Sequence, residues 1–272
     1  MPTLDEINYI KHEPDGPLAK YVQALWIAYK PDNTQRLSYD LLSDCGSCII
    51  MNFSEKLVLK RHQTEHKVHH EMVIVGPSAS LFNIRFENDI FTVGINFHPA
   101  AGEVFIKGGI APLIDSIETC QQTGMIELDT FYRHIASEKH KNTIQHNLLF
   151  EQLEALLNKK LEDYQQSTKQ KITKMLELLK LDLPNDQLAQ ACGISERELQ
   201  RRFKQYVGIS PRVYQRIMKL NKIKTTLSDG EFDNLTQIAL DNGYYDQAHF
   251  IRDFKSFMQR TPKQYYKQKK DS

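Results

Sequence analysis

Over the first 110 residues, short apolar runs alternate with polar breaks in the pattern of β-strands. Alternating apolar residues at 82–86 and at 91–97, with Glu87-Asn88-Asp89 between them, predict a hairpin. Residues 48–53 and 57–59 predict a strand or hairpin, 72–75 ends at the turn Gly76-Pro77, and 18–29 predicts a helical turn continuing as a strand. Together these runs predict a small barrel or sandwich, a fold that can hold a small ligand in its mouth.

From Ala100 onward the apolar residues recur every three or four positions, which predicts helices over 101–106, 128–135 and 148–164. The last has the longest stripe, made of Phe150, Leu153, Leu157, Leu161 and Tyr164. Two arrangements suit such a stripe: it covers the β-rich part of its own chain, or it packs two subunits into a homodimer. Barely two heptads do not decide between them.

Residues 183–266 contain an internal repeat. Each residue of a first set has an identical or similar residue 50 or 51 positions later, in a second set. The first set is Leu188, Ala189, Gly193, Ser195, Leu199, Arg201, Phe203, Lys204, Ser210, Pro211 and Tyr214; the second is Ile238, Ala239, Gly243, Asp246, Phe250, Arg252, Phe254, Lys255, Thr261, Pro262 and Tyr265. The offset grows by one after the glycine, as a longer turn in the second copy would require.

Each copy predicts two short helices joined by a tight glycine turn. In the first, Asn185 or Asp186 is expected to cap a helix that stops at Gly193, and Ser195 with Glu198 forms a capping box for the next. Asp246 caps the corresponding helix of the second copy. Ser210-Pro211 and Thr261-Pro262 each predict the start of a further helix. This is the geometry of a helix-turn-helix, whose second helix enters the DNA major groove.

Helical spacing also predicts which side chains face outward. Leu199 and Phe203 point to the core in the first copy, as do Phe250 and Phe254 in the second. The outward set is Arg197, Gln200, Arg201 and Lys204 in the first copy and Gln247, His249, Arg252 and Lys255 in the second.

These residues resemble the AraC/XylS family of bacterial transcription regulators over roughly 169–267. The resemblance is carried by Cys192-Gly193-Ile194-Ser195, Leu199-Gln200-Arg201-Arg202-Phe203-Lys204, the run 242–250, Arg252, Phe254-Lys255 and Thr261-Pro262. It departs at Gln259 and Arg260, where the family usually has a glycine before Thr-Pro. More weakly, Asp44-Cys45-Gly46, Gly76-Pro77 and 93–99 are similar to the amino-terminal domain of one branch of these regulators, a match that supplies no ligand.

The resemblance implies double-stranded DNA as partner, RNA polymerase as a second one, and the base-reading positions Arg197, Gln200, Arg201, Gln247, His249 and Arg252. Arginine can pair with guanine and glutamine with adenine through two hydrogen bonds each. Phosphate contacts are expected from Lys204, Lys255 and the run Lys219, Lys222 and Lys224.

Charge divides the chain in the same way. Residues 1–168 hold 15 Lys and Arg against 22 Asp and Glu, a balance of −7, whereas residues 169–272 hold 20 against 12, a balance of +8. A basic domain attracts a polyanion and an acidic one does not. We therefore expect an α+β protein with an acidic regulatory domain over 1–165, β-rich to about 110 and helical after it. An all-α DNA-binding domain follows over 169–268, with helix-turn-helix units at 184–206 and 235–257.

Composition places the chain among ordinary globular proteins, with 40% hydrophobic and 25% charged residues. The first residues lack a basic and then apolar leader, and no apolar run approaches the roughly 20 residues that cross a bilayer. We expect a cytoplasmic protein with no membrane contact. Four cysteines, unevenly placed, do not form a secreted disulfide framework.

Candidate chemistry elsewhere is weak. Cys45 and Cys48 have redox or metal spacing, but zinc needs two further ligands and no second such pair exists; they suit strand packing equally. Histidines at 62, 66, 69 and 70 suggest a metal site, and His62, His66 and His69 would share a face if the segment were helical. Their polar neighbours instead predict a solvated hairpin end. The motifs of hydrolases, zinc proteases and nucleotide-binding enzymes are missing, so no enzyme, cofactor or metal is expected.

Two alternatives to a plain DNA-binding regulator remain. In one, the β-rich domain is a small-molecule receptor whose ligand controls DNA binding. In the other, the carboxy-terminal repeat binds proteins and its positive charge is incidental.

Overall fold

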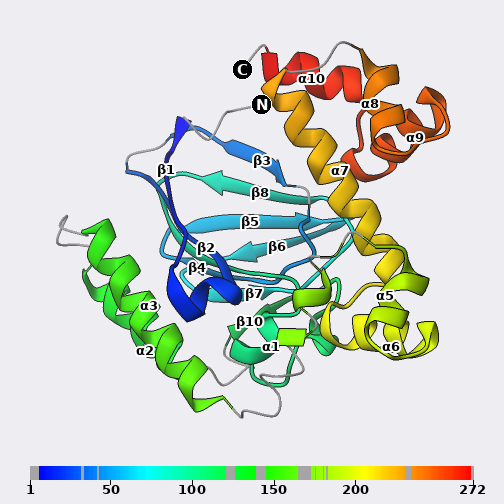
Figure 1. Cartoon of the computed structure of the whole chain (residues 1–272). Helices are drawn as coiled ribbons and strands as arrows, with labels where there is room; N and C mark the ends of the chain where they lie inside the picture. The colour runs from blue at the N-terminus through cyan, green and yellow to red at the C-terminus, as the bar shows by residue number, and fades with distance from the viewer. Residues whose placement is uncertain are drawn as a thin grey trace.

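The computed structural model describes residues 6–31, 34–41, 43–120, 126–138, 145–164, 173–174, 176–179, 181, 183–230 and 234–270 (Figure 1). Strands dominate the first 120 residues and helices the remainder, so the predicted α+β class is confirmed. Within the described part of the chain, no helix is long and apolar enough to cross a membrane. The polar run chosen as the domain boundary lies mostly outside the described residues, and the two-domain division stays a prediction.

Within the described residues, ten strands form two antiparallel sheets. The larger has the order β1 (Asn8–His12), β2 (Val22–Lys30), β9 (Ile90–Phe97), β4 (Cys48–Asn52), β7 (Met72–Val75) and β10 (Ile117–Thr119). The smaller has the order β3 (Leu37–Leu41), β8 (Phe82–Glu87), β5 (Lys56–Arg61) and β6 (Thr64–Val68). The short helix η2 (Gly16–Lys20) opens β2, as the sequence predicted.

The larger sheet is buried on both faces. Its inner face meets the smaller sheet through an apolar cluster that includes Trp26, Ile50 and Phe86. Its outer face carries Leu25, Ile49 and other side chains into a second cluster, covered by α1 (Gly102–Phe105), α2 (Ile126–Glu138) and α3 (His146–Asp163). Figure 1 shows α2 and α3 lying together on that side. Burial on both faces explains why β2 and β9 are nearly continuous apolar runs.

The predicted hairpin at 82–97 is wrong. β8 pairs with β3 and β5 in the smaller sheet, whereas β9 pairs with β2 and β4 in the larger. The chain changes sheets at Asn88, which takes a left-handed φ of 64°. β8 has one buried face and β9 has two, so they suit different places. β4 and β5 are also in different sheets, which excludes the hairpin alternative there.

The stripe on α3 packs against its own chain. Phe150, Leu153, Leu157 and Leu161 are buried in the cluster beneath the larger sheet, and the Tyr164 hydroxyl donates to the Glu103 carbonyl oxygen. This supports the arrangement in which the helix covers the β-rich part. Homodimerisation stays a prediction.

The carboxy-terminal helices are arranged around one long helix, α7 (Pro211–Asp229). α5 (Asn185–Ala191) and α6 (Glu196–Tyr206) lie at one end, and α8 (Leu235–Asp241), α9 (Gln247–Met258) and α10 (Pro262–Lys270) at the other (Figure 1). Ile217 of α7 belongs to the cluster beneath the larger sheet, which also includes the buried residues of the first unit, and Leu220, Ile223 and Leu227 belong to the cluster of the second unit. One helix therefore contributes to both cores.

Candidate nucleic-acid interface

The two repeat copies fold into the same turn. In the first, Gly193 has a φ of 63°, its N–H donates to the Gln190 carbonyl at 3.0 Å, and the Ile194 N–H donates to the Ala189 carbonyl at 3.0 Å. The second reproduces both bonds from Gly243 to Leu240 and from Tyr244 to Ala239, each at 2.9 Å. Glycine occupies the left-handed position because it has no side chain to clash there.

Side-chain caps begin the second helix of each copy. The Ser195 hydroxyl accepts the Glu198 N–H at 3.2 Å, and the Asp246 carboxylate accepts the His249 N–H at 2.6 Å. Both predicted caps are confirmed. The Glu198 carboxylate, however, accepts hydrogen bonds from Arg201 and Arg202 of its own helix. The second bond of a capping box, from the Ser195 N–H to this carboxylate, is therefore not the one that Glu198 makes.

The predicted cap at Asn185 or Asp186 is wrong. α5 begins at Asn185, its cap position is Pro184, and no side chain bonds to the first turn. Pro184 has no side-chain acceptor for the N–H groups of the first turn, and its backbone is extended, with φ −54° and ψ 153°. The Asn185 Oδ1 atom is buried with no partner among the described residues.

The predicted inward and outward faces are confirmed. Leu199, Phe203, Phe250 and Phe254 are fully buried. Five predicted base-reading residues are exposed, namely Arg197, Gln200, Arg201, His249 and Arg252, and Gln247 is half-buried. The structure thus places the side chains where a groove could reach them; their contacts with bases stay predictions.

A carboxylate holds the central arginine of α6. Arg201 donates from Nε and Nη2 to the two oxygens of Glu198, both at 2.7 Å, and Arg202 Nε donates to the same carboxylate at 2.8 Å. These bonds lower the pKa of Glu198 to about 2. The predicted contact of Arg201 with a base would have to compete with this carboxylate.

A polar network that the sequence analysis missed fixes α9 against α7. Asp253, only 8% exposed, accepts the Tyr244 hydroxyl at 2.7 Å and is ion-paired with Arg216. Arg216 also donates to Ser256 Oγ at 3.0 Å and lies over the Phe257 ring. Asp253 of the second copy is equivalent to Arg202 of the first. This change from a basic to an acidic residue was the signal in the sequence that could have pointed to the network.

The predicted phosphate-binding lysines fall on several elements. Lys204, Lys255, Lys219 and Lys222 are exposed and Lys224 is half-buried. Lys219 and Lys222 line a groove of about 740 Å³ beside α7, between the start of the first unit and the turn of the second. Lys219 also lies 5.1 Å from the centre of the Tyr244 ring.

The departure at Gln259 does not change the turn. Gln259 adopts a left-handed φ of 56°, and the equivalent Gly208 has a φ of 88°. The second copy therefore keeps the conformation without the residue that adopts it most easily.

The cysteines and histidines do not gather into a site. Cys45 belongs to the cluster beneath the larger sheet and Cys48 packs between the sheets, and burial raises the pKa of both thiols. His69 and His70 contact the backbone carbonyls of Glu55 and Phe53. Among the described residues, no group of three or more His, Cys, Asp or Glu side chains could hold a metal ion.

Two helix-turn-helix units on a shared central helix define the class of this protein. Residues 188–268 match the family described as a helix-turn-helix domain, and residues 10–118 match a domain of unknown function, DUF6597. Residues 188–268 thus match an AraC-type helix-turn-helix domain.

Named relatives match less than a third of this chain. The chain is 33% identical over 84 residues to an HTH-type transcriptional regulator of Staphylococcus aureus, covering 31% of this chain and 11% of that one. It is 32% identical over 83 residues to the regulator MtrA of Neisseria gonorrhoeae, covering 30% and 27%. The chain thus spans about a tenth to a quarter of the length of these relatives.

Solved structures show a partial likeness. ToxT from Vibrio cholerae has 12% identity, with 89% of this chain and 96% of that chain covered and a TM-score of 0.44. A regulator with an AraC-type DNA-binding domain from Chromobacterium violaceum has 28% identity, with 39% and 96% covered and a TM-score of 0.34.

Proposed function

We propose that this chain is a sequence-specific DNA-binding transcription regulator, in which α6 and α9 enter successive turns of the major groove. One observation carries the proposal: two copies of the same turn each present an exposed arginine, Arg201 and Arg252, at equivalent places. α7 contributes to both cores and would keep the two helices about 34 Å apart, as one turn of DNA requires.

Salt dependence tests this proposal. The full chain should bind random duplex DNA, and the logarithm of its affinity should fall linearly with the logarithm of salt concentration because counterions are released. Enrichment of bound fragments from a random pool should then return a two-part site. An affinity for random duplex DNA that does not change with salt concentration would favour the alternative of a protein-interaction module.

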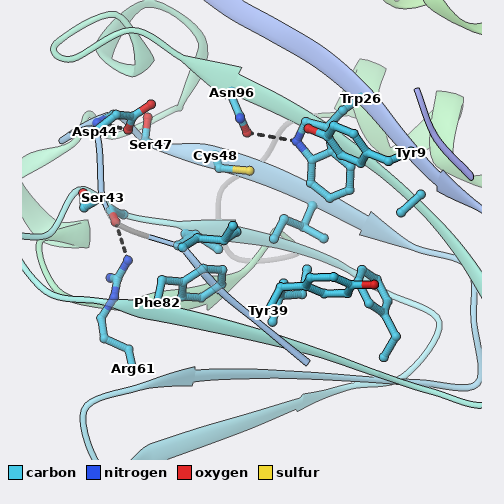
Figure 2. A pocket seen from close by; sticks show the side chains of 18 of the residues that line it. Tyr9, Trp26, Tyr39, Ser43, Asp44, Ser47, Cys48, Arg61, Phe82 and Asn96 are labelled. Atoms are coloured by element: carbon cyan, nitrogen blue, oxygen red, sulfur yellow. Dashed lines mark hydrogen bonds between the residues drawn. The ribbon is translucent and has the colours of Figure 1, made fainter. Parts of the chain in front are cut away.

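A second candidate function is that of a receptor whose ligand controls DNA binding. It is favoured by a cavity of about 250 Å³ between the sheets, whose wall includes Ser43 and Asp44 (Figure 2). The same segment contacts α7, because Asn221 Nδ2 donates to the Ser43 carbonyl at 3.1 Å. A ligand that binds only the folded chain raises its Tm, so a metabolite screen by thermal stabilisation tests this function.

Homodimerisation, contact with RNA polymerase and a cytoplasmic location remain predictions. The two-domain division at about 165–169 belongs to the same proposal.

A further inference from the structure

The turn of the second copy is one residue longer than that of the first. In the first copy, only Ile194 lies between the turn glycine and the cap Ser195. In the second copy, Tyr244 and Tyr245 lie between the glycine and the cap Asp246. The N–H groups of Ile194 and Tyr244 donate to equivalent alanine carbonyls, so Tyr244 is the counterpart of Ile194 and Tyr245 is the added residue.

One tyrosine of this turn is buried and the other lies in solvent. Tyr244 is 6% exposed, its hydroxyl donates to Asp253 and its ring packs against Phe250. Tyr245 is 90% exposed, whereas the next most exposed large hydrophobic side chain of the described residues, Leu240, is 54% exposed. The fold therefore does not use the added side chain for packing, and its ring and hydroxyl are both in contact with solvent.

Tyr245 lies at the start of the second recognition helix. α9 begins at Gln247, and the N-terminal residues of a recognition helix contact base edges in the major groove. The Asp246 carboxylate accepts the His249 N–H at 2.6 Å, so it is occupied in capping this helix. In the proposed docking, the residue directly before that cap is expected beside the phosphates that border the groove.

A cation beside the same turn favours a negatively charged partner. Lys219 of α7 is exposed and its Nζ atom lies 5.1 Å from the centre of the Tyr244 ring. The same Nζ atom would be 3.8 Å from a Cβ atom at Gly243. Its charge attracts a phosphate to the turn. Tyr245 supplies a different group there, a hydroxyl donor on a rigid ring that carries no charge.

We propose that the Tyr245 hydroxyl donates a hydrogen bond to one phosphate of the DNA backbone, and that this bond positions the second helix-turn-helix unit on the duplex without reading its sequence. Tyrosine hydroxyls are among the groups that bind DNA phosphates, and such contacts fix register and orientation rather than base preference. The inference rests on the proposed DNA binding. It gives the second unit a contact that the first unit, which lacks the added residue, does not make.

Removal of the hydroxyl tests the proposal on the full chain, with the duplex selected from the random pool. Tyr245→Phe should weaken binding by about fivefold to tenfold, and Tyr245→Ala by the same factor, because the hydroxyl rather than the ring makes the contact. Tyr29→Phe makes the same chemical change on β2, outside the repeat, and should bind like the parent. Full binding by Tyr245→Phe would overturn the proposal. A loss seen only with Tyr245→Ala would also overturn it, because it would assign the contact to the ring.

Salt and sequence dependence separate this contact from those of the lysines and arginines. A neutral donor releases no counterion, so Tyr245→Phe should keep the salt slope of the parent, whereas Lys255→Ala should reduce the slope by about one. The factor lost by Tyr245→Phe should also be the same on duplexes that carry single base changes. A loss that depends on one base pair would overturn the proposed role, because Tyr245 would then read a base.

A modified duplex identifies the phosphate. Single phosphates of the selected duplex are replaced, one position at a time, by methylphosphonate, which removes the charge of that acceptor. At one position the loss of affinity should be about threefold or more larger for the parent than for Tyr245→Phe, since the variant has no donor to lose there. Equal losses for parent and variant at every position would contradict the contact.

Stability and DNA retention are measured in parallel. Because Tyr245 is 90% exposed, Tyr245→Phe should leave the Tm and the circular dichroism spectrum unchanged. A lowered Tm with a matching loss of DNA binding would contradict the contact, because it would assign the loss to folding. Salt-dependent binding by the parent together with full binding by Tyr245→Phe overturns this inference alone. A parent chain that does not bind duplex DNA overturns the proposed function and the contact with it.

Discussion

Arg260, two residues before α10, forms an ion pair with Asp40 of β3, across 220 positions of sequence. Both side chains are mostly buried. The pair ties the second helix-turn-helix unit to the smaller sheet, next to the segment that lines the cavity. Together with the bond from Asn221 to Ser43, it connects the β-rich part to α7 and to the segment between α9 and α10.

The strength of this tie can be measured by a double-mutant cycle. Asp40→Asn, Arg260→Gln and the double variant should give a coupling free energy of about 1–2 kcal/mol in urea unfolding, between the values for exposed and buried pairs. Additive effects of the two substitutions would show that the ion pair does not stabilise the contact.

Substitutions at the equivalent left-handed positions Gln259 and Gly208 should change stability in opposite directions. Gln259→Gly should raise the free energy of unfolding by about 0.5–1 kcal/mol, because it relieves a left-handed conformation that costs other residues more than glycine. Gly208→Ala should lower it by about 2 kcal/mol, since the new Cβ would lie 2.9 Å from Ile114 and 3.0 Å from Pro77. Denaturant unfolding of the three chains checks both signs.

Glu198 should restrain DNA binding. Glu198→Gln removes a carboxylate that competes for Arg201 and repels phosphates, so affinity for duplex DNA should rise at every salt concentration. Glu196→Gln is the matched control on the same helix and changes the same charge without freeing Arg201. If both variants gain the same affinity for DNA, the gain comes from the lost negative charge alone, and Glu198 does not restrain Arg201.

The pH dependence of Glu198 follows from its pKa of about 2 in the folded chain, compared with about 4.3 for an unperturbed glutamate. A depressed pKa adds stability above the unfolded value, and this stability is lost as the pH falls from about 5 toward 2. An NMR titration should find the Glu198 midpoint near 2 and the ion pair intact between pH 5 and 8. A midpoint near 4 would contradict the pairing.

Asp253 should be the most sensitive polar residue of the second unit. Asp253→Asn leaves Arg216 without its ion pair and weakens the bond from Tyr244, so the free energy of unfolding should fall by about 2–4 kcal/mol. Asp241→Asn, at an exposed position on α8, should change it by less than about 0.5 kcal/mol. Urea unfolding distinguishes them, and equal effects would contradict the structural role of Asp253.

Local signals in the sequence predicted most of the helical part, except the start of α5 and the network around Asp253. The caps at Ser195 and Asp246, the turn glycines and the inward phenylalanines each depend on residues within a few positions of one another. The repeat also aligned the two copies residue by residue, so each position of one copy could be compared with its equivalent in the other.

Contacts between distant segments were not predictable in the same way. Alternation assigned one apolar face to β8 and β9 but did not say which sheet each joins, because strand pairing depends on burial by segments elsewhere in the chain. The same holds for Arg260 with Asp40 and for the buried Arg61, whose guanidinium donates to the carbonyls of Gly76 and Ser116. No sequence spacing connects these residues.

Binding of single variants to a selected duplex measures what the exposed arginines of α6 and α9 contribute to DNA recognition. Arg201→Ala and Arg252→Ala should each cost about 1–3 kcal/mol and relax the base preference at one position. Lys204→Ala should weaken binding to all sequences alike and reduce the salt slope by about one. Affinity and base preference left unchanged by both arginine substitutions would contradict the account.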